Sequence, residues 1–383
     1  MSGRRLALVT RRYWPQVGGA ERAMANLAGE LRRLGDDVRV VTAQWDPQWP
    51  REVVNREVPV IRLPQPRVRW WGTMRYMHGL MHWLDEQRPK LDGVIVSMLK
   101  HDAWCAVRTF RGSNIPVLLR AEGGGTSGDV AWQRSALGGG RIRRICQEAQ
   151  AIVAPSPAVA EELRQAGYAA DKIRFVPNGV ELPPPRTNAI RQQARHALRE
   201  ANHDLALDER AHLAVYTGRL DRNKGLRELV QGWAKIALRW PLARLWLVGE
   251  GPLRDELWEM ISDYDLRYRI CLPGVFDDVG DILAAADLFV LPSYEEGLSL
   301  ALLEALAMGL PAVLTDIPGN RLAAGDFGSY VPVRDVAQLA EAISRLFDSA
   351  EQRRSLGTAG RERVAAEFGL EAMAVRHREL LLG

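Results

Sequence analysis

The sequence predicts an α/β protein of two domains, each built on a parallel β-sheet covered by helices. With 383 residues, the chain is long for one α/β domain and comfortable for two. Short apolar runs of β type alternate with longer helical patterns along the chain, which is typical of parallel sheets. A turn dipeptide and a proline run near residue 180 divide these repeats into two sets.

The first half contains the strands of one predicted sheet. An amphipathic helix from Glu21 to Leu34 lies between the first two strands, and Gly35 follows it in the position where glycine commonly ends a helix. The apolar runs that predict the strands are 6–10, 38–42, 58–63, 94–97, 117–120, 152–155 and 173–176.

The join between the halves is an extended connector, Asn178-Gly179 followed by the prolines 183–185. We therefore predict a first domain over residues 1–180 and a second over 181–367, with a last helix within 368–383 packing back on the first. A polar helix over 190–201 opens the second half. The predicted strands of the second sheet are 214–217, 245–248, 270–272, 288–291, 312–315 and 330–333.

The composition is that of an ordinary globular protein, with 47% hydrophobic and 26% charged residues. The apolar stretch near the N-terminus is too short for the core of a signal peptide. The longest apolar run, 298–314, is interrupted by Glu304, Gly309 and Pro311 and predicts no membrane span. These features predict a cytoplasmic location. The three cysteines form no CxxC pair, and we expect neither a metal site nor a cofactor.

The charge is unevenly divided between the halves. Residues 1–180 contain 27 lysines and arginines against 17 aspartates and glutamates, a net charge of +10, while the remainder has a net charge of −6. The basic half could face an anionic acceptor or an anionic membrane surface. A solvated basic face without a partner explains the charge equally well.

A loop with two cations follows the first strand of the second half. It reads Gly218-Arg219-Leu220-Asp221-Arg222-Asn223-Lys224-Gly225. Arg219 and Lys224 stand there between a buried strand and a helix, with no acidic run nearby, which favours an anionic ligand such as a diphosphate. The alternative is a pair of solvated loop cations.

A second loop joins the strand 288–291 to an almost wholly apolar helix. Glu296 lies in the loop, where it could accept hydrogen bonds from sugar hydroxyls. Glu304 is the lone charge of the helix and needs a donor, for which ribose hydroxyls are suitable. The backbone amides of Gly297, Leu298, Ser299 and Leu300 open the helix and could face a phosphate or a hexose. Capping of local amides is the structural alternative.

A glycine pair, Gly18-Gly19, precedes the first helix of the chain. Amides at a helix N-terminus can receive a phosphate, and glycine permits its close approach. A glycine pair before a helix is more often an ordinary turn.

These motifs together resemble glycosyltransferase family 4. Glu296 and Glu304 match the family's Glu-x7-Glu motif, and Arg219 and Lys224 lie in a match to its Gly-Arg-Leu…Lys-Gly motif. Gly18-Gly19 matches its glycine pair. The resemblance implies two Rossmann-like domains facing each other across a cleft, the GT-B fold. It also implies retaining transfer of a sugar from a nucleoside diphosphate. No Asp-x-Asp motif stands at a predicted strand end, which predicts that the transfer is metal-independent.

The resemblance assigns a role to each donor-side residue. Arg219 and Lys224 would stabilise the diphosphate leaving group, Glu296 would orient the transferred sugar, and Glu304 would hold the ribose. A UDP-sugar is the first choice of donor and GDP-mannose the second. The expected acceptor is a hydroxyl of a glycan, a glycolipid or a small-molecule glycoside.

The chain departs from the family on the acceptor side. The family usually has a histidine soon after the strand 117–120, and Glu122 stands at that place here. Arg120, Glu122 and His101 are the acceptor-side candidates. The departure keeps open a non-catalytic subunit or binding module with the same fold. A nucleotide-sugar epimerase is a further alternative.

The tract 62–83 combines arginines with Trp70, Trp71 and Trp83. Such a mixture suits a membrane interface or a lipid-linked acceptor. It also suits a helix that packs its tryptophans on a sheet. Nucleic acid is not an expected partner, because the tract matches no binding module and the second half is acidic.

Overall fold

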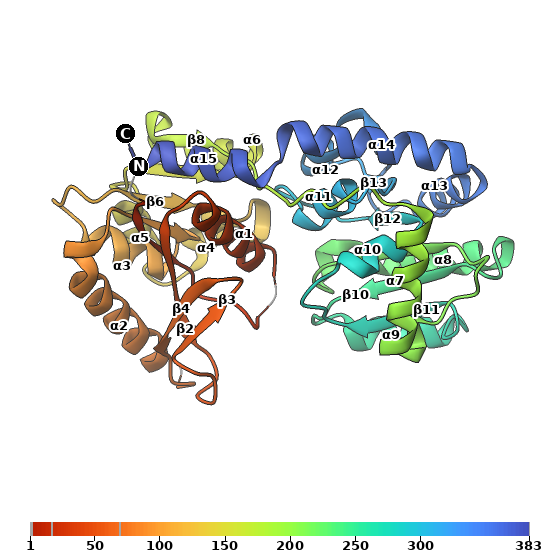
Figure 1. Ribbon diagram of the computed structural model, residues 1–383, viewed down its shortest axis with the longest axis horizontal. Coiled ribbons are helices and arrows are strands. Elements are labelled where there is room, and N and C mark those ends of the chain that lie inside the picture. The colour runs from red at the N-terminus through yellow and green to blue at the C-terminus, as the bar shows by residue number, and fades with distance from the viewer. Residues whose placement is uncertain (1–2, 17, 69, 383) are drawn as a thin grey trace. The chain divides into compact units, whose positions relative to one another are not determined.

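The computed structural model describes residues 3–16, 18–68 and 70–382 (Figure 1). Val17, in the glycine-pair loop, and Arg69, in the arginine and tryptophan tract, lie outside the described residues. The chain divides into two compact units. The first runs to Gly179 and includes the segment from Leu370 onward, and the second is Val180–Gly369.

Among the described residues, the first unit contains an eight-stranded sheet in the order β3-β4-β2-β1-β5-β6-β7-β8. Its strands are β1 Arg5–Val9, β2 Asp37–Gln44, β3 Glu52–Asn55, β4 Val58–Pro64, β5 Gly93–Ser97, β6 Val117–Arg120, β7 Ala151–Ala154 and β8 Ile173–Phe175. Its helices are α1 Gly19–Arg33, α2 Trp71–Gln87, α3 His101–Thr109, α4 Asp129–Ser135, α5 Gly139–Cys146, α6 Pro157–Gln165 and α15 Leu370–Leu380.

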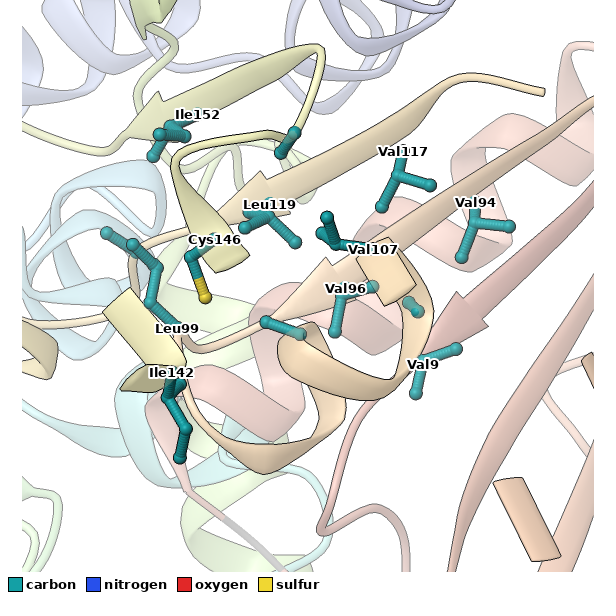
Figure 2. Packing of buried hydrophobic residues seen from close by; sticks show 14 of the residues in the cluster. Val9, Val94, Val96, Leu99, Val107, Val117, Leu119, Ile142, Cys146 and Ile152 are labelled. Atoms are coloured by element: carbon teal, nitrogen blue, oxygen red, sulfur yellow. The ribbon is translucent and has the colours of Figure 1, made fainter. Parts of the chain in front are cut away.

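Both faces of this sheet are covered by helices, because its strands alternate their side chains between two apolar clusters. Ala7 and Val9 of β1 belong to the cluster under α2, α3, α5 and α6, part of which Figure 2 shows. Leu6 and Leu8 belong to the other cluster, where α1 and α15 pack. The near-continuous apolar strands of the sequence follow from this burial on both sides.

The edge strand β3 was not predicted from the sequence. It pairs antiparallel with β4, whereas β4, β2, β1 and β5 pair in parallel. The turn between β3 and β4 uses Arg56 and Glu57 with φ of 49° and 64°. Tight hairpin turns with positive φ usually contain glycine or asparagine, so this turn lacks the sequence signal by which hairpins are recognised.

Among the described residues, the second unit contains a six-stranded sheet in the order β11-β10-β9-β12-β13-β14. Its strands are β9 Leu213–Thr217, β10 Arg244–Val248, β11 Ile270–Gly274, β12 Leu288–Leu291, β13 Ala312–Thr315 and β14 Ser329–Val331. Its helices are α7 Asn188–Ala201, α8 Leu226–Arg239, α9 Arg254–Asp263, α10 Gly280–Ala285, α11 Leu300–Ala307, α12 Pro318–Ala324, α13 Val336–Asp348 and α14 Ala350–Glu367. The predicted fold class, α/β with two parallel sheets, is confirmed. No helix of the described residues is long and apolar enough to cross a bilayer.

The last helix, α15, joins the core of the first unit. Met373 and Ala374 are buried in the same cluster as the inner face of α1. His377 is fully buried, and its Nε2 lies 3.0 Å from Arg120 Nη1. Because a guanidinium can only donate, Nε2 is the acceptor, and the ring proton lies on Nδ1, which donates to the Met373 carbonyl at 2.8 Å. Burial, with a smaller effect of Arg120, lowers the pKa of His377 to about 3.

This histidine predicts a loss of stability in mild acid. The unfolded chain takes up a proton at a histidine pKa of about 6.5 while the folded chain does not, so stability falls as the pH drops below that value. From about pH 7.5 to about pH 5.5, His377 should contribute a loss of ~1.4 kcal/mol. Glutamine can keep both hydrogen bonds without titrating, so His377→Gln should remove this part of the slope in thermal unfolding. His82→Gln, at an exposed site of α2, should retain it, and equal slopes in both variants would contradict the assignment.

Candidate active site

Apart from Gly18 and Gly19, which belong to the first unit, the sequence-predicted donor residues lie at the carboxyl end of the second sheet. The strand order reverses between β9 and β12, which are neighbours in the sheet although 70 residues separate them in the chain. In open α/β sheets, ligands bind beyond the carboxyl ends of the strands at such a reversal. The loop after β9 carries Arg219 and Lys224, and the loop after β12 carries Glu296.

Lys224 and Glu296 form an ion pair across this reversal. Lys224 Nζ lies 2.6 Å from Glu296 Oε1, and the two side chains are 25% and 10% exposed. No acidic run lies near the loop cations in the sequence, but each cation has a carboxylate partner in the structure. Glu296 comes from 72 residues away, and Arg219 lies 3.4 Å from Asp221 Oδ2 in its own loop. The ion pair forms because the fold joins two loops that are distant in sequence.

Backbone contacts hold these two loops together. The Tyr294 amide donates to the Asn223 carbonyl at 2.8 Å. Gly225 has a φ of +64°, and a Cβ at that position would overlap the Pro292 carbonyl oxygen. Only glycine fits both conditions, so Gly225 lets the loop after β9 lie directly against the loop after β12.

The loops after the neighbouring strands β10 and β13 also make close backbone contacts at this edge of the sheet. A Cβ at Gly249, after β10, would overlap the Gly218 carbonyl. A Cβ at Gly319, in α12 after β13, would overlap the carbonyl of Glu296 itself. The loops after four strands are thus in backbone contact along the carboxyl edge of the sheet.

A chain of buried polar side chains, absent from the sequence prediction, supports Glu296. Ser293 Oγ donates to Glu296 Oε1 at 2.7 Å. Thr315 Oγ1 donates to the Ser293 carbonyl, and Asn320 Nδ2 donates to the Thr315 carbonyl at 2.9 Å. All three side chains are buried. Their only sequence signal is that Ser293 and Thr315 are polar residues at the ends of apolar strands.

Helix α11 begins where the predicted phosphate-facing amides end. Leu300 is its first residue, and Ser299 caps it by accepting from the Leu302 amide at 3.4 Å. Gly297 and Leu298 lie in the loop between Glu296 and this cap. Glu304 is half-buried in the middle of the helix. The structure thus places the predicted donor residues from Glu296 to Glu304 on one loop and the helix that follows it.

The first unit has its own reversal of strand order, between β1 and β5. Gly18 and Gly19 follow β1, with Gly18 as the N-terminal cap of α1 in an extended conformation. A Cβ at Gly19 would meet nothing within 4 Å. The backbone conformation of Gly19 does not require glycine, and no atom of this unit would clash with a side chain there. The absence of a side chain at Gly19 leaves open space at the first turn of α1.

His101 is the first residue of α3, just after β5. Its ring makes an edge contact with Trp132 at 5.2 Å between centroids. Burial, with the cations Arg11 and Lys100 nearby, lowers the pKa of His101, so the ring is neutral at pH 7. The next residue, Asp102, is buried and pairs with Arg11 at 3.3 Å. A neutral imidazole and an arginine thus lie at the reversal of the first sheet.

Glu122 and Arg120 form a buried ion pair. Arg120 Nε donates to Glu122 Oε1 at 3.0 Å, and Ser97 Oγ donates to the same oxygen at 3.1 Å. Burial raises the pKa of Glu122, and Arg120 opposes that rise. The remaining nitrogens of Arg120 donate to Asn178 Oδ1 at 2.7 Å and to His377.

These contacts correct the role expected for Arg120. Its side chain is 0% exposed, and its partners all belong to the first unit, so it cannot touch an acceptor. Arg120 instead holds Glu122 in place. Asp129, a residue that sequence reasoning missed, also fixes this region, because it accepts from the amides of Glu122 and Leu99 at 2.9 and 3.1 Å. Burial raises the pKa of Asp129 to about 6.

Two family models match the chain. Residues 17–182 match glycosyltransferase family 4, and residues 211–349 match glycosyl transferases group 1. The chain belongs to glycosyltransferase family 4. It is a nucleotide-sugar-dependent glycosyltransferase with the GT-B fold.

Known proteins similar to this glycosyltransferase cover nearly its full length. The N-acetyl-alpha-D-glucosaminyl L-malate synthase of Bacillus anthracis is 23% identical over 96% of this chain and 94% of its own. The sucrose-phosphate synthase of Thermosynechococcus elongatus is similar in structure with a TM-score of 0.80 and 24% identity, over 98% of each chain. The HepE protein of Anabaena, solved in complex with UDP-glucose, has a TM-score of 0.77 and 16% identity, over 99% of each chain. The two structural likenesses show the shared fold.

The contact at Gly225 predicts a specific effect of a small substitution. In Gly225→Ala the new methyl group would push the two loops apart and separate Lys224 from Glu296. Misplacement of a binding group by about 1 Å can cost ~10²-fold, so affinity for nucleoside diphosphates, measured by calorimetry with UDP and GDP, should fall by at least about tenfold.

Gly309→Ala is the matched control. Gly309 also has a left-handed backbone, with a φ of +78°, but a Cβ there would meet its nearest atom only at 3.9 Å. This variant should lose some stability and keep the affinity of the parent. If Gly225→Ala also kept it, the contact between the loops would not be needed for nucleotide binding.

Proposed function

We propose that the protein is a retaining, metal-independent transferase that moves a hexose from a nucleoside diphosphate to an acceptor hydroxyl. The Lys224–Glu296 pair is the observation that carries this proposal. A cation that can neutralise a diphosphate and a carboxylate that can bind sugar hydroxyls are fixed 2.6 Å apart at the carboxyl edge of a parallel sheet.

The roles follow from the charges of these groups. As the bond between the anomeric carbon and the diphosphate breaks, negative charge grows on the leaving oxygen, and Lys224 and Arg219 stabilise it. Glu296 accepts hydrogen bonds from the transferred sugar, and Glu304 accepts them from the ribose. The amides from Gly297 to Leu300 face the phosphate or the hexose.

Retention requires that the new bond form on the same face of the sugar as the broken one. We propose that the acceptor hydroxyl attacks from that face and passes its proton to the leaving phosphate oxygen. The two cations then do the work of a divalent metal, and neither a metal nor a prosthetic group is needed.

We propose a UDP-sugar as the first choice of donor and GDP-mannose as the second. The HepE structure with UDP-glucose supports this order, because that protein shares the fold over nearly the whole chain. On the acceptor side, His101 and Glu122 are the residues we assign, with Arg120 as the positioning residue of Glu122. The acceptor is a hydroxyl of a glycan, a glycolipid or a small-molecule glycoside.

Lys224 and Glu304 should respond differently to substitution. Lys224→Ala removes a stabiliser of the leaving group, so turnover should fall by ~10²-fold or more. Glu304→Gln weakens hydrogen bonds to the ribose, so the donor KM should rise more than turnover falls. The measurement is release of nucleoside diphosphate under steady-state conditions, with melting temperatures taken alongside.

Exposed residues of the second unit provide the controls. Lys235→Ala and Glu259→Gln remove the same charges from α8 and α9 and should leave both kinetic constants unchanged. If Lys224→Ala and Glu304→Gln fold normally and transfer at the parent rate, the donor site is assigned to the wrong residues.

The metal-independent mechanism predicts that transfer survives chelation. Donor-dependent transfer should continue at the parent rate after treatment with EDTA and removal of the chelate. A rate that vanishes and returns only with an added divalent cation would contradict this part of the proposal and leave the sugar-transfer proposal standing.

A further inference from the structure

The start of α2 presents large apolar side chains to solvent. Val68, Trp70, Trp71 and Met74 are 60%, 59%, 60% and 64% exposed. They lie within seven consecutive residues, and Met74 N donates to the Trp70 carbonyl, which places these two residues one helical turn apart. We refer to the four side chains as the apolar patch. Exposed aromatic side chains gathered in this way mark an interaction surface rather than a random surface composition.

Other side chains of α2 are buried in the core of the first unit. Tyr76, Leu80 and Leu84 are buried, and Trp83 packs partly buried against the same cluster. The prediction that the tryptophans of this tract pack on the sheet is thus right for Trp83 and wrong for Trp70 and Trp71. Packing within the unit leaves these two side chains uncovered.

The backbone conformation of Trp70 is a second, independent indication that this region is an interaction surface. Trp70 caps α2 with a φ of +63° and a ψ of −49°, a conformation that a bulky side chain rarely adopts. Strained residues of this kind persist where the surrounding structure holds them, and they cluster at functional surfaces. The strained residue Trp70 is exposed to solvent, so burial of its side chain within the chain does not offset the cost of the strain.

The positive charge around the apolar patch indicates that its partner is anionic. From Val58 to Leu84 the sequence contains no aspartate or glutamate and four arginines. Arg67 and Arg75 are exposed at either side of the apolar residues, and the positive end of the α2 dipole lies among them. Arg67 lies 3.4 Å from Asp46 Oδ2, so Arg75 is the cation on which the attraction mainly depends. Tryptophan prefers the headgroup level of a bilayer, and arginine is attracted to anionic lipids.

We propose that the apolar patch, with Arg67 and Arg75 beside it, docks the protein on the surface of an anionic lipid bilayer. Trp70, Trp71 and Met74 enter the headgroup boundary, and Arg67 and Arg75 contact lipid phosphates. With so few inserted side chains the attachment is peripheral and reversible. This inference does not depend on the proposed reaction, because it concerns a surface of the first unit and needs no nucleotide.

Sedimentation with lipid vesicles tests the proposal. The full-length protein should bind vesicles of phosphatidylglycerol mixed equally with phosphatidylcholine, and bind pure phosphatidylcholine at least about fivefold more weakly, since each basic residue near an anionic surface contributes roughly that factor. High salt should weaken binding to the mixed vesicles. Trp70→Ser/Trp71→Ser should lower the partition coefficient by at least about tenfold. Arg75→Glu should lower it several-fold.

The control variants replace exposed apolar side chains and an exposed arginine on the second unit, outside the patch. Leu238 and Tyr268 of the second unit are 85% and 86% exposed, and Leu238→Ser/Tyr268→Ser should bind vesicles like the parent. Arg210→Glu, at a side chain 82% exposed, controls for the charge change. The proposal is overturned if the parent does not sediment with anionic vesicles, or if both pairs of substitutions have the same effect. It is also overturned if light scattering shows that the parent is an oligomer which Trp70→Ser/Trp71→Ser converts to a monomer, because the patch would then be a protein interface.

Discussion

The proposed donor site depends on one backbone contact, the approach of Gly225 to the Pro292 carbonyl. An ion pair between a lysine and a glutamate at the surface usually contributes little, because two flexible side chains must be ordered to make it. Lys224 and Glu296 avoid most of that cost. Their loops are already fixed by backbone packing, and the buried Ser293 and Thr315 hold Glu296 from behind. The pair is therefore preorganised, which is the condition under which electrostatic groups stabilise a transition state effectively.

The first unit organises its carboxyl edge around a buried cation instead. A guanidinium without water is costly unless each nitrogen finds an acceptor. Arg120 meets that condition with Glu122 beside its own strand, Asn178 after β8, and His377 of α15. One side chain thus joins three segments that are far apart in the sequence. Its neutral partner His377 and its charged partner Glu122 differ because only Glu122 can balance the positive charge.

Strands that are buried on both faces could be predicted from the sequence alone. The apolar runs 117–120, 288–291 and 312–315 are strands with the predicted bounds, since strands buried on both faces leave an unbroken apolar signal. Features that depend on distant residues could not be predicted. The partner of Lys224 lies 72 residues away, and the burial of Arg120 follows from the return of α15. The strand β3 was missed because its turn uses arginine and glutamate where glycine or asparagine is expected.

Both units contain glycines and larger residues with positive φ, and the surroundings of these residues differ. In the second unit Gly225 and Gly249 take such conformations at places where a Cβ would overlap a backbone carbonyl, so no side chain would fit there. In the first unit Met98 and Trp70 take them with large side chains. The cost at Met98 is offset within the chain, because its amide donates to the Arg120 carbonyl and its loop leads to His101. Trp70 caps α2, but the cap of a helix requires no tryptophan, and glycine would take this backbone conformation with less strain. The exposed indole is thus the feature of Trp70 that the fold of its own unit leaves unexplained, and contact with an external surface explains it.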